Sequence, residues 1–347
     1  MLYYTGLEEV IFSKHELLSD EPDELVIISG FLGPSPLERL QELDNLKITV
    51  IGGMYPSGID ARLWNSLEKI DGRNPNLTLL FTNREIHSKI YIWKKNNKTL
   101  GALIGSANFS SNGLRTDYRE SLADATRDTF SPLELYYKFI LENSSKAPSL
   151  KKDQSIVDFK TVPTDSHPEI EKITFSAEIP LYDPKKDEVP VSSGLNWGCA
   201  RLFSDAHVAE GDAYIRIPKN IIKDNPNLIK PLDPEFKTPE GRRKRNSDPI
   251  ELIWDDGVIM EASLEGVQVF NDKHYPKQLA SYSPKTPFID GHRISKKSIL
   301  GRYIRQRLDI GVDEIITKEM LEDYGRTTIT LSLIGDGVYY ADFSKKT

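Results

Sequence analysis

The first 145 residues alternate short apolar runs with longer segments whose apolar residues recur at helical spacing. The runs have the length and β-branched content of buried strands, and the segments between them fit amphipathic helices. Strand–helix alternation predicts an α/β fold with a largely parallel central sheet. The expected strands are 25–31, 47–53 and 77–81, and the expected helices are 36–43, 59–70 and 131–143.

The pattern changes after a polar segment, 146–178, that contains three prolines and is typical of a linker. From residue 179 onward the chain favours short strands separated by turns, with three helices, the last capped by Thr317. We therefore expect three parts: an α/β domain at 1–145, a linker at 146–178, and a mainly-β pseudo-barrel at 179–347. The expected strands are 213–217, 250–254, 258–263, 327–333 and 338–343, and the expected helices are 219–223, 298–308 and 317–324.

One hairpin carries the strongest chemical signal. His87-Ser88-Lys89 opens an alternating strand, Asn96-Asn97 supplies turn chemistry, and the return strand leads into Gly105-Ser106-Ala107-Asn108. Side chains two apart on a strand share a face, so His87 and Lys89 should lie side by side. Asn108 follows the returning strand, where it can meet them. An imidazole, an ammonium and an amide that converge in this way predict a site for a phosphoryl group.

The residue types suit attack on a phosphodiester, which needs a nucleophile, a proton for the leaving oxygen and positive charge on the phosphate. His87 can attack, Lys89 can neutralise a phosphate oxygen, and Asn108 and Ser106 can donate hydrogen bonds. Glu120 could hold the imidazole in its useful tautomer. This scheme needs no metal. Taken singly, a histidine at a strand start is usually structural and Gly-Ser-Ala-Asn is a common turn; the joint spacing favours the catalytic interpretation.

His-x-Lys followed by Gly-Ser-x-Asn resembles the signature of the phospholipase D superfamily, and Glu120 fits its nuclease branch. Lys94 stands where the lipid-cleaving members have an aspartate, which argues against a lipase. The resemblance implies two histidines in each site, one that attacks and one that protonates the leaving group. The chain holds a single His-x-Lys, so the resemblance implies a homodimer whose two subunits share one site.

Composition limits the class of protein. The 347 residues are 38% hydrophobic and 28% charged, as in an ordinary soluble protein. The lone cysteine, Cys199, and the lack of an apolar membrane or signal segment lead us to expect a cytoplasmic protein without structural metal. The net charge of −7 does not favour DNA binding, but residues 268–307 hold nine Lys or Arg against two acidic side chains. Such a local surplus can bind phosphates.

Segments 211–219, 299–308 and 323–326 resemble the C-terminal domain of phospholipase-D-type restriction endonucleases of the NgoFVII and BfiI type, which has a B-three-like fold. With both halves included, the resemblance covers nearly the whole chain. It implies two arms that clasp the major groove, with residue types suited to base edges. The first arm would use Asn196, Trp197 and Arg201; the second Gln268, Asn271, Asp272, Lys273, His274, Tyr275, Lys277 and Gln278; backbone contacts would come from Arg293, Lys296, Lys297 and the basic run 242–245.

The resemblance implies a sequence-specific, metal-independent type II restriction endonuclease that cleaves double-stranded DNA through a phosphohistidine and uses no cofactor. It also allows two partners: a helicase-like ATPase, whose phosphate-binding loop this chain lacks, and a cognate DNA methyltransferase. Two alternatives stay open. One is another phosphodiester hydrolase; the other is a DNA-binding regulator whose phospholipase-D-like domain serves only for dimerisation.

Overall fold

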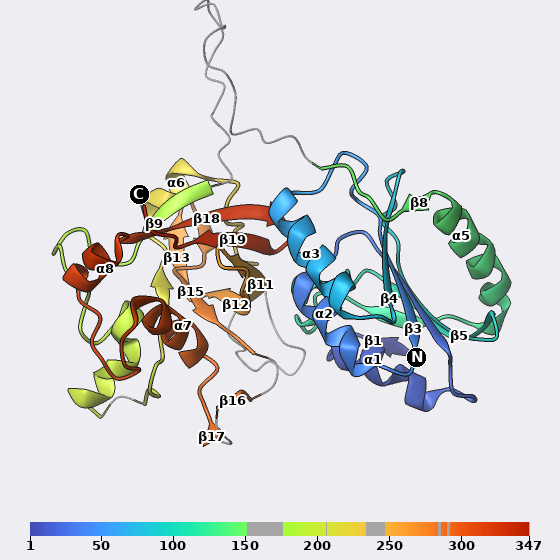
Figure 1. The fold of residues 1–347 in the computed structure, drawn as a ribbon, viewed down its shortest axis with the longest axis horizontal. Coiled ribbons are helices and arrows are strands. Elements are labelled where there is room, and N and C mark those ends of the chain that lie inside the picture. Colours follow the sequence, from blue (N-terminus) through green and yellow to red (C-terminus); the bar gives the residue numbers. More distant parts are fainter. Residues whose placement is uncertain (151–175, 206, 234–246, 284–285, 290–291, 347) are drawn as a thin grey trace, which may run out of the picture.

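The computed structural model describes residues 1–150, 176–205, 207–233, 247–283, 286–289 and 292–346. Its two domains lie side by side, with the blue-to-green first domain and the yellow-to-red second domain separated in Figure 1. The first domain contains the described residues up to 150, and the second those from 176 onward. Both the α/β architecture and the mainly-β architecture predicted from the sequence are confirmed.

Within the described residues, the first domain is built on an eight-stranded sheet in the order β1-β7-β6-β5-β2-β3-β4-β8. Only β2–β3 and β3–β4 pair in parallel. The prediction of a largely parallel sheet is therefore correct for these three strands alone, because the β5–β6 hairpin extends the sheet in antiparallel fashion. The strands are β1 (Leu2–Tyr3), β2 (Glu24–Ser29), β3 (Lys47–Gly52), β4 (Leu77–Thr82), β5 (Lys89–Lys95), β6 (Lys98–Gly105), β7 (Leu122–Asp124) and β8 (Ser144–Ser145).

Helices cover both faces of this sheet (Figure 1). Successive residues of a strand point to opposite faces, so Leu25 and Ile27 of β2 join the core beneath α1, α2 and α3, while Val26 and Ile28 pack on the side of α5. The helices are α1 (Leu7–Ser13), α2 (Pro34–Arg39), α3 (Ala61–Arg73), α4 (Ser111–Leu114) and α5 (Phe130–Glu142), with 3₁₀ helices η1 (Lys14–Leu17), η2 (Leu40–Glu42) and η3 (Arg127–Thr129).

The second domain contains, in its described part, a seven-stranded sheet in the order β10-β15-β12-β11-β19-β18-β9 and two small hairpins. Thr317 caps the last helix by accepting a hydrogen bond from the Met320 N–H, as predicted. The strands are β9 (Ser176–Pro180), β10 (Ile215–Arg216), β11 (Ser247–Trp254), β12 (Ile259–Glu265), β13 (Gln268–Phe270), β14 (Lys273–Tyr275), β15 (Gln278–Ser281), β16 (Phe288–Ile289), β17 (His292–Arg293), β18 (Thr328–Gly335) and β19 (Val338–Asp342); the helices are η4 (Gly194–Leu202), α6 (Lys219–Asp224), α7 (Ser298–Leu308) and α8 (Lys318–Tyr324).

The two domains share part of one hydrophobic core. Ile253, Ile334 and Val338 of the second domain are buried among the core residues of the first. Strand β9 begins at Ser176, within the last residues of the expected linker, while 151–175 lie outside the described residues. Shared burial of this kind means that the two domains are held together by hydrophobic packing as well as by the covalent chain.

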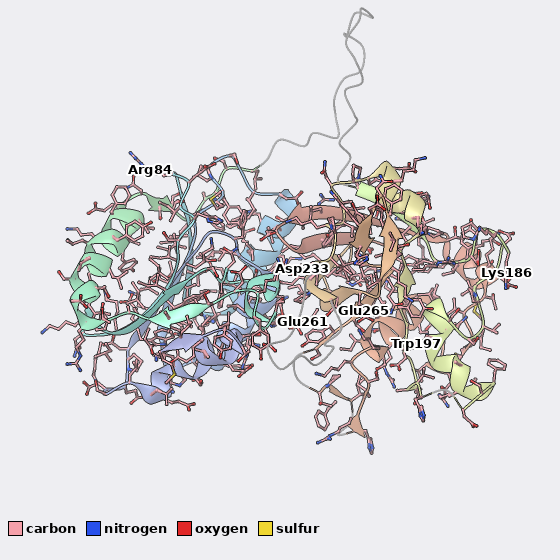
Figure 2. All side chains as sticks on the ribbon, turned by 180° about the vertical axis from the view of Figure 1, so that it is seen from behind. Arg84, Lys186, Trp197, Asp233, Glu261 and Glu265 are labelled. Atoms are coloured by element: carbon pink, nitrogen blue, oxygen red, sulfur yellow. The ribbon has the colours of Figure 1, made fainter. Side chains whose placement is uncertain are left out.

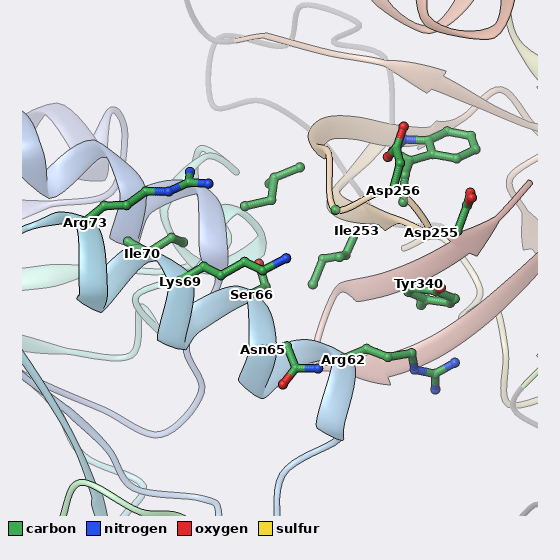
Figure 3. Close-up of a pocket in the computed structure, with 13 residues that line it drawn as sticks. Arg62, Asn65, Ser66, Lys69, Ile70, Arg73, Ile253, Asp255, Asp256 and Tyr340 are labelled. Atoms are coloured by element: carbon green, nitrogen blue, oxygen red, sulfur yellow. The ribbon is translucent and has the colours of Figure 1, made fainter. Parts of the chain in front are cut away.

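A groove of ≈ 230 Å³ marks one edge of this contact, between α3 and the β11–β12 turn (Figure 3). Arg62 of α3 crosses it, with its guanidinium carbon 4.6 Å from the ring centroid of Tyr340. Lys69 and Arg73 follow on the same helix, opposite Asp255 and Asp256. The groove therefore carries charges of both signs. Among the described residues, no helix is long and apolar enough to cross a membrane.

Candidate active site

The β5–β6 hairpin forms as predicted and brings the motif residues to one end of the sheet. Asn96 and Asn97 have φ values of 48° and 64°, the left-handed backbone that a tight two-residue turn needs and that asparagine tolerates. The register pairs Lys89 with Gly105. The segment before β5 and the segment after β6 therefore leave the sheet at the same end, which places His87 and Asn108 close together.

His87 and Lys89 are in direct contact. The Lys89 Nζ lies 2.9 Å from Nδ1 and 3.1 Å from Nε2 of His87, and it donates to the His87 carbonyl oxygen at 2.6 Å. An atom almost equidistant from both ring nitrogens lies on the lone-pair axis of neither, so the ammonium sits over the imidazole and does not fix its tautomer. His87 is exposed, whereas Lys89 is buried. The ring can therefore be reached from solvent above a buried positive charge.

Asn108 is anchored next to this pair. Its Oδ1 accepts a hydrogen bond from the Phe31 N–H at 3.1 Å, which leaves its amide group as the donor. A Cβ at position 30 would lie 3.1 Å from His87 Cδ2 and 3.2 Å from Asn108 Oδ1. Gly30 therefore lets the imidazole and the amide approach the same point. The sequence offered only a glycine at a strand end as a signal for this contribution.

Charge around Lys89 acts in two directions. Burial lowers its pKa, and the negative charges of Glu120 and Asp336 act against that lowering. Glu120 is half-buried, and in the described subunit no hydrogen bond joins it to His87. Ser106 is exposed and its hydroxyl accepts from the Ser121 N–H at 3.1 Å, which holds the segment next to Glu120. Glu120 thus acts on Lys89 through its negative charge.

Lys94 has a packing role. It is buried in β5, with its Nζ 5.1 Å from the ring centroid of Tyr137 on α5. A cation over an aromatic face is stabilised without a carboxylate partner. Lys94, which stands where lipid-cleaving members have an aspartate, therefore points to the side of the sheet covered by α5.

The first expected arm is built largely into the protein. Asn196 is fully buried: its Nδ2 donates to the Ile316 and Pro190 carbonyl oxygens, and its Oδ1 accepts from the Ile316 N–H and the Arg305 guanidinium. All of its hydrogen-bonding capacity is used inside the domain, so it is not presented to DNA. Trp197 is half-buried against Tyr214, and Arg201 pairs with Asp313.

The second expected arm is the β13–β14 hairpin and the segment after it. Asn271 and Asp272 form its turn, with φ values of 47° and 58°, and both are exposed. Lys273, His274 and Lys277 are exposed as well. The other arm residues are engaged: Gln268 donates to the Ile217 and Pro276 carbonyl oxygens, Gln278 donates to Glu265, and Tyr275 is buried.

The expected backbone contacts fall into three groups. Arg293 is exposed on β17, so it is available to a partner. Lys297 pairs with Glu265 at 2.6 Å, and Lys296 lies 5.5 Å from the Tyr282 ring centroid. Figure 2 shows Glu265 and Trp197 on the second domain. The basic run 242–245 lies outside the described residues. In the part of the chain that is described, no group of three His, Cys, Asp or Glu side chains is arranged to hold a metal ion.

Comparison with protein families gives two matches that together span most of the chain. Residues 5–158 match the N-terminal phospholipase D domain of the NgoFVII restriction endonuclease. Residues 167–335 match the C-terminal B3-like DNA-binding domain of the same family. No curated protein matches the chain.

Three solved structures are similar to part of the chain. NucT from Helicobacter pylori is 18% identical, with 42% of this chain and 98% of that chain covered and a TM-score of 0.32. Nuc from Salmonella typhimurium is 12% identical, with 43% and 97% covered and a TM-score of 0.29. Yeast tyrosyl-DNA phosphodiesterase is 19% identical, with 36% and 30% covered and a TM-score of 0.24.

Proposed function

Because the chain belongs to the NgoFVII restriction endonuclease family and is a site-specific DNA-cleaving hydrolase, we propose that His87 is its nucleophile. In this proposal the enzyme is a metal-independent type II endonuclease. The cluster of His87, Lys89 and Asn108 carries the proposal: an exposed imidazole beside a buried ammonium and an anchored amide. These three groups match the nucleophile, the counter-charge and the donor that phosphodiester cleavage requires.

The reaction proceeds in two displacements. A ring nitrogen of His87 attacks phosphorus, a P–N bond forms and the P–O bond to the leaving strand breaks, while His87 of the partner subunit gives its proton to the leaving oxygen. Water then attacks the phosphorus of the phosphohistidine, the P–N bond to His87 breaks, and the same partner histidine takes a proton from the attacking water. Lys89 and Asn108 hold the phosphate oxygens through both steps, and Ser106 supplies a further hydroxyl at the same end of the hairpin.

Two copies of the chain are required by this scheme because one subunit contributes one histidine. The shared site lies on a two-fold axis between first domains, and the two second domains carry the DNA recognition. Exposed Asn271, Asp272, Lys273 and His274 are the groups of the second arm that reach DNA, with Lys277 beside them. A helicase-like ATPase and a cognate methyltransferase complete the proposed set of partners.

Plasmid cleavage in excess EDTA, with His87→Ala alongside, tests the nucleophile and the metal independence. The wild type should give discrete fragments, and His87→Ala should cleave at least about 10³-fold more slowly while it still binds the specific site. Cleavage that returns only on addition of Mg²⁺ would refute metal independence. Equal cleavage by His87→Ala would refute the nucleophile.

Mixing the two proteins tests the shared site. A heterodimer of wild-type and His87→Ala subunits has no complete pair of histidines, so an excess of the variant should suppress cleavage by the wild type. If activity merely follows the amount of wild-type protein, each subunit has its own site. Specific binding without cleavage under every metal condition, with or without the ATPase, would favour the regulator instead.

A further inference from the structure

A buried carboxylate of the DNA-binding domain reaches into the nuclease domain. Glu251 lies on β11 with 1% of its surface exposed. Its Oε2 accepts a hydrogen bond from the Ser35 N–H and its Oε1 from the Ser111 N–H, both at 2.8 Å. Each acceptor oxygen is therefore used by a different segment of the first domain. One carboxylate therefore joins the first turns of α2 and α4, at residues that are 76 positions apart in the chain.

The loops that lead into these two helices meet at Asn108. The loop before Ser35 donates its Phe31 N–H to the Asn108 side chain and its Gly33 N–H to the Phe109 carbonyl oxygen. The segment from Asn108 leads within three residues to Ser111. The two loops are thus hydrogen-bonded to each other near Asn108. Glu251 joins them a second time, at Ser35 and Ser111. A shift of either loop would move the amide that the proposed mechanism places on the phosphate.

The fit around Glu251 is close. A Cβ at position 33 would lie 2.1 Å from Glu251 Oε1, so glycine is needed for the carboxylate to reach both N–H groups. Burial raises the pKa of Glu251, and the two backbone N–H groups and the charge of Arg115 oppose that rise. A charged group taken out of water in this way is costly unless it is hydrogen-bonded. A leucine would fill the space at less cost if packing alone were needed.

Glu261 offers a comparison within the same interface. It lies on neighbouring strand β12 and contacts the Ser35 hydroxyl at 2.6 Å and the Arg115 guanidinium. Figure 2 shows it at the boundary between the domains. Glu261 therefore helps to hold the domains together through the Ser35 hydroxyl and the Arg115 guanidinium, whereas Glu251 accepts from the backbone N–H groups of Ser35 and Ser111. The two glutamates separate domain contact from loop positioning.

We propose that Glu251 is a positioning residue through which the docked DNA-binding domain holds the Asn108 loop in its catalytic geometry. This inference rests on the proposed role of Asn108 in cleavage. It makes the recognition domain a structural part of the active site, so the nuclease domain is set for cleavage only while β11 is seated against it. The carboxylate acts through Ser35 and Ser111 and does not itself touch the DNA.

Glu251→Gln in the full-length protein tests the positioning role of the Glu251 carboxylate, with Glu261→Gln as the matched control. A carboxamide can accept from one of the two N–H groups and turns an NH₂ toward the other. The single-turnover cleavage rate of Glu251→Gln should fall about 10- to 100-fold, since displacement of a catalytic group by about 1 Å can cost about 100-fold. Its affinity for specific DNA should change less than about threefold. Glu261→Gln should change the cleavage rate less than about threefold.

Inhibition by orthovanadate, a mimic of the phosphoryl transition state, provides a second measurement of the active-site geometry. Vanadate should inhibit Glu251→Gln more weakly than the wild type and inhibit Glu261→Gln normally. If Glu251→Gln does not fold, Glu251→Asp keeps the charge on a side chain one methylene shorter, and its cleavage rate should still fall while DNA binding holds.

The outcomes separate the two proposals. Wild-type cleavage with an equal rate in Glu251→Gln overturns the positioning role and leaves the nuclease mechanism intact. An equal loss of rate in both glutamine variants assigns the effect to general loosening of the interface and also overturns it. A wild type that binds specific DNA but never cleaves it overturns the proposed function, and it overturns the positioning role of Glu251 as well.

Discussion

Two hairpins of this molecule carry charged residues near their ends, and they are supported very differently. Both turn through consecutive residues of positive φ, Asn96-Asn97 in β5–β6 and Asn271-Asp272 in β13–β14. The β5–β6 hairpin lies inside an eight-stranded sheet with helices on both faces, and Lys89 is only 5% exposed. The β13–β14 hairpin forms a separate two-stranded sheet whose tip is exposed. The same turn chemistry therefore occurs in a hairpin built into a large sheet in one place and in a separate, accessible hairpin in the other.

The proposed roles of the two hairpins account for this difference in support. A phosphodiester under attack has one geometry, so its ligands gain from being held rigidly before the substrate arrives. Base edges are read by side chains that must leave the protein surface and enter a groove. The first arm breaks this simple division, because Asn196 belongs to a buried hydrogen-bond network with Arg305. Both domains therefore contain rigidly held residues, and in the second domain the exposed β13–β14 hairpin projects from such a core.

Arg305→Met tests whether the first arm depends on that buried network, and it should have the largest effect on stability. The Arg305 guanidinium donates to the carbonyl oxygens of Leu195, Gly301 and Glu314 and to Asn196. Methionine fills the volume but leaves these acceptors unpaired, so the free energy of unfolding should fall by about 3–5 kcal/mol. Urea denaturation measures the change. Arg201→Met is the control: it removes an exposed arginine paired with Asp313 and should lower the free energy of unfolding by less than about 1 kcal/mol. Similar losses in the two variants would contradict the role of Arg305 as a buried anchor.

Asn108→Asp tests whether the Asn108 amide contributes to cleavage as the proposed mechanism requires. Aspartate keeps the oxygen that accepts the Phe31 N–H, but it loses the amide donor and brings negative charge toward the phosphate. We expect cleavage to fall by about 10²- to 10³-fold with little loss of stability or of DNA affinity. Single-turnover cleavage and thermal unfolding distinguish these effects. A variant that cleaves normally would mean that Asn108 only anchors the loop.

Local signals in the sequence were sufficient for most elements and for the meeting of the candidate active-site residues. Strand and helix periodicity predicted β2, β3, β4, α3, α5, α7 and α8, and His87, Lys89 and Asn108 could be brought together because a single hairpin relates them. The sheet order was less accessible, because antiparallel extension through β5–β6 depends on long-range pairing. Family resemblance supplied the B-three-like fold of the second half.

Contacts between distant segments could not be predicted from local patterns. Glu251 looks like an ordinary polar position in a strand, and only the docking of β11 against Ser35 and Ser111 gives it a role. Asn196 has a residue type suited to adenine, yet its burial is decided by Arg305 and Ile316, more than 100 residues away. Residue type indicates what a side chain can bind, and tertiary packing decides whether it is available.

Alanine substitution at the exposed second arm should have the smallest effects and divides its residues by role. If His274 reads a base edge, His274→Ala should weaken specific binding by about 1–3 kcal/mol and relax the preference at one position of the site. If Lys277 contacts a phosphate, Lys277→Ala should weaken binding to all sequences alike and lower the salt dependence by about one ion. Binding isotherms on specific and shuffled DNA at several salt concentrations separate the two patterns. Unchanged binding in both variants would mean that this exposed hairpin lies outside the groove, and that accessibility in the second domain does not mark the DNA-reading surface.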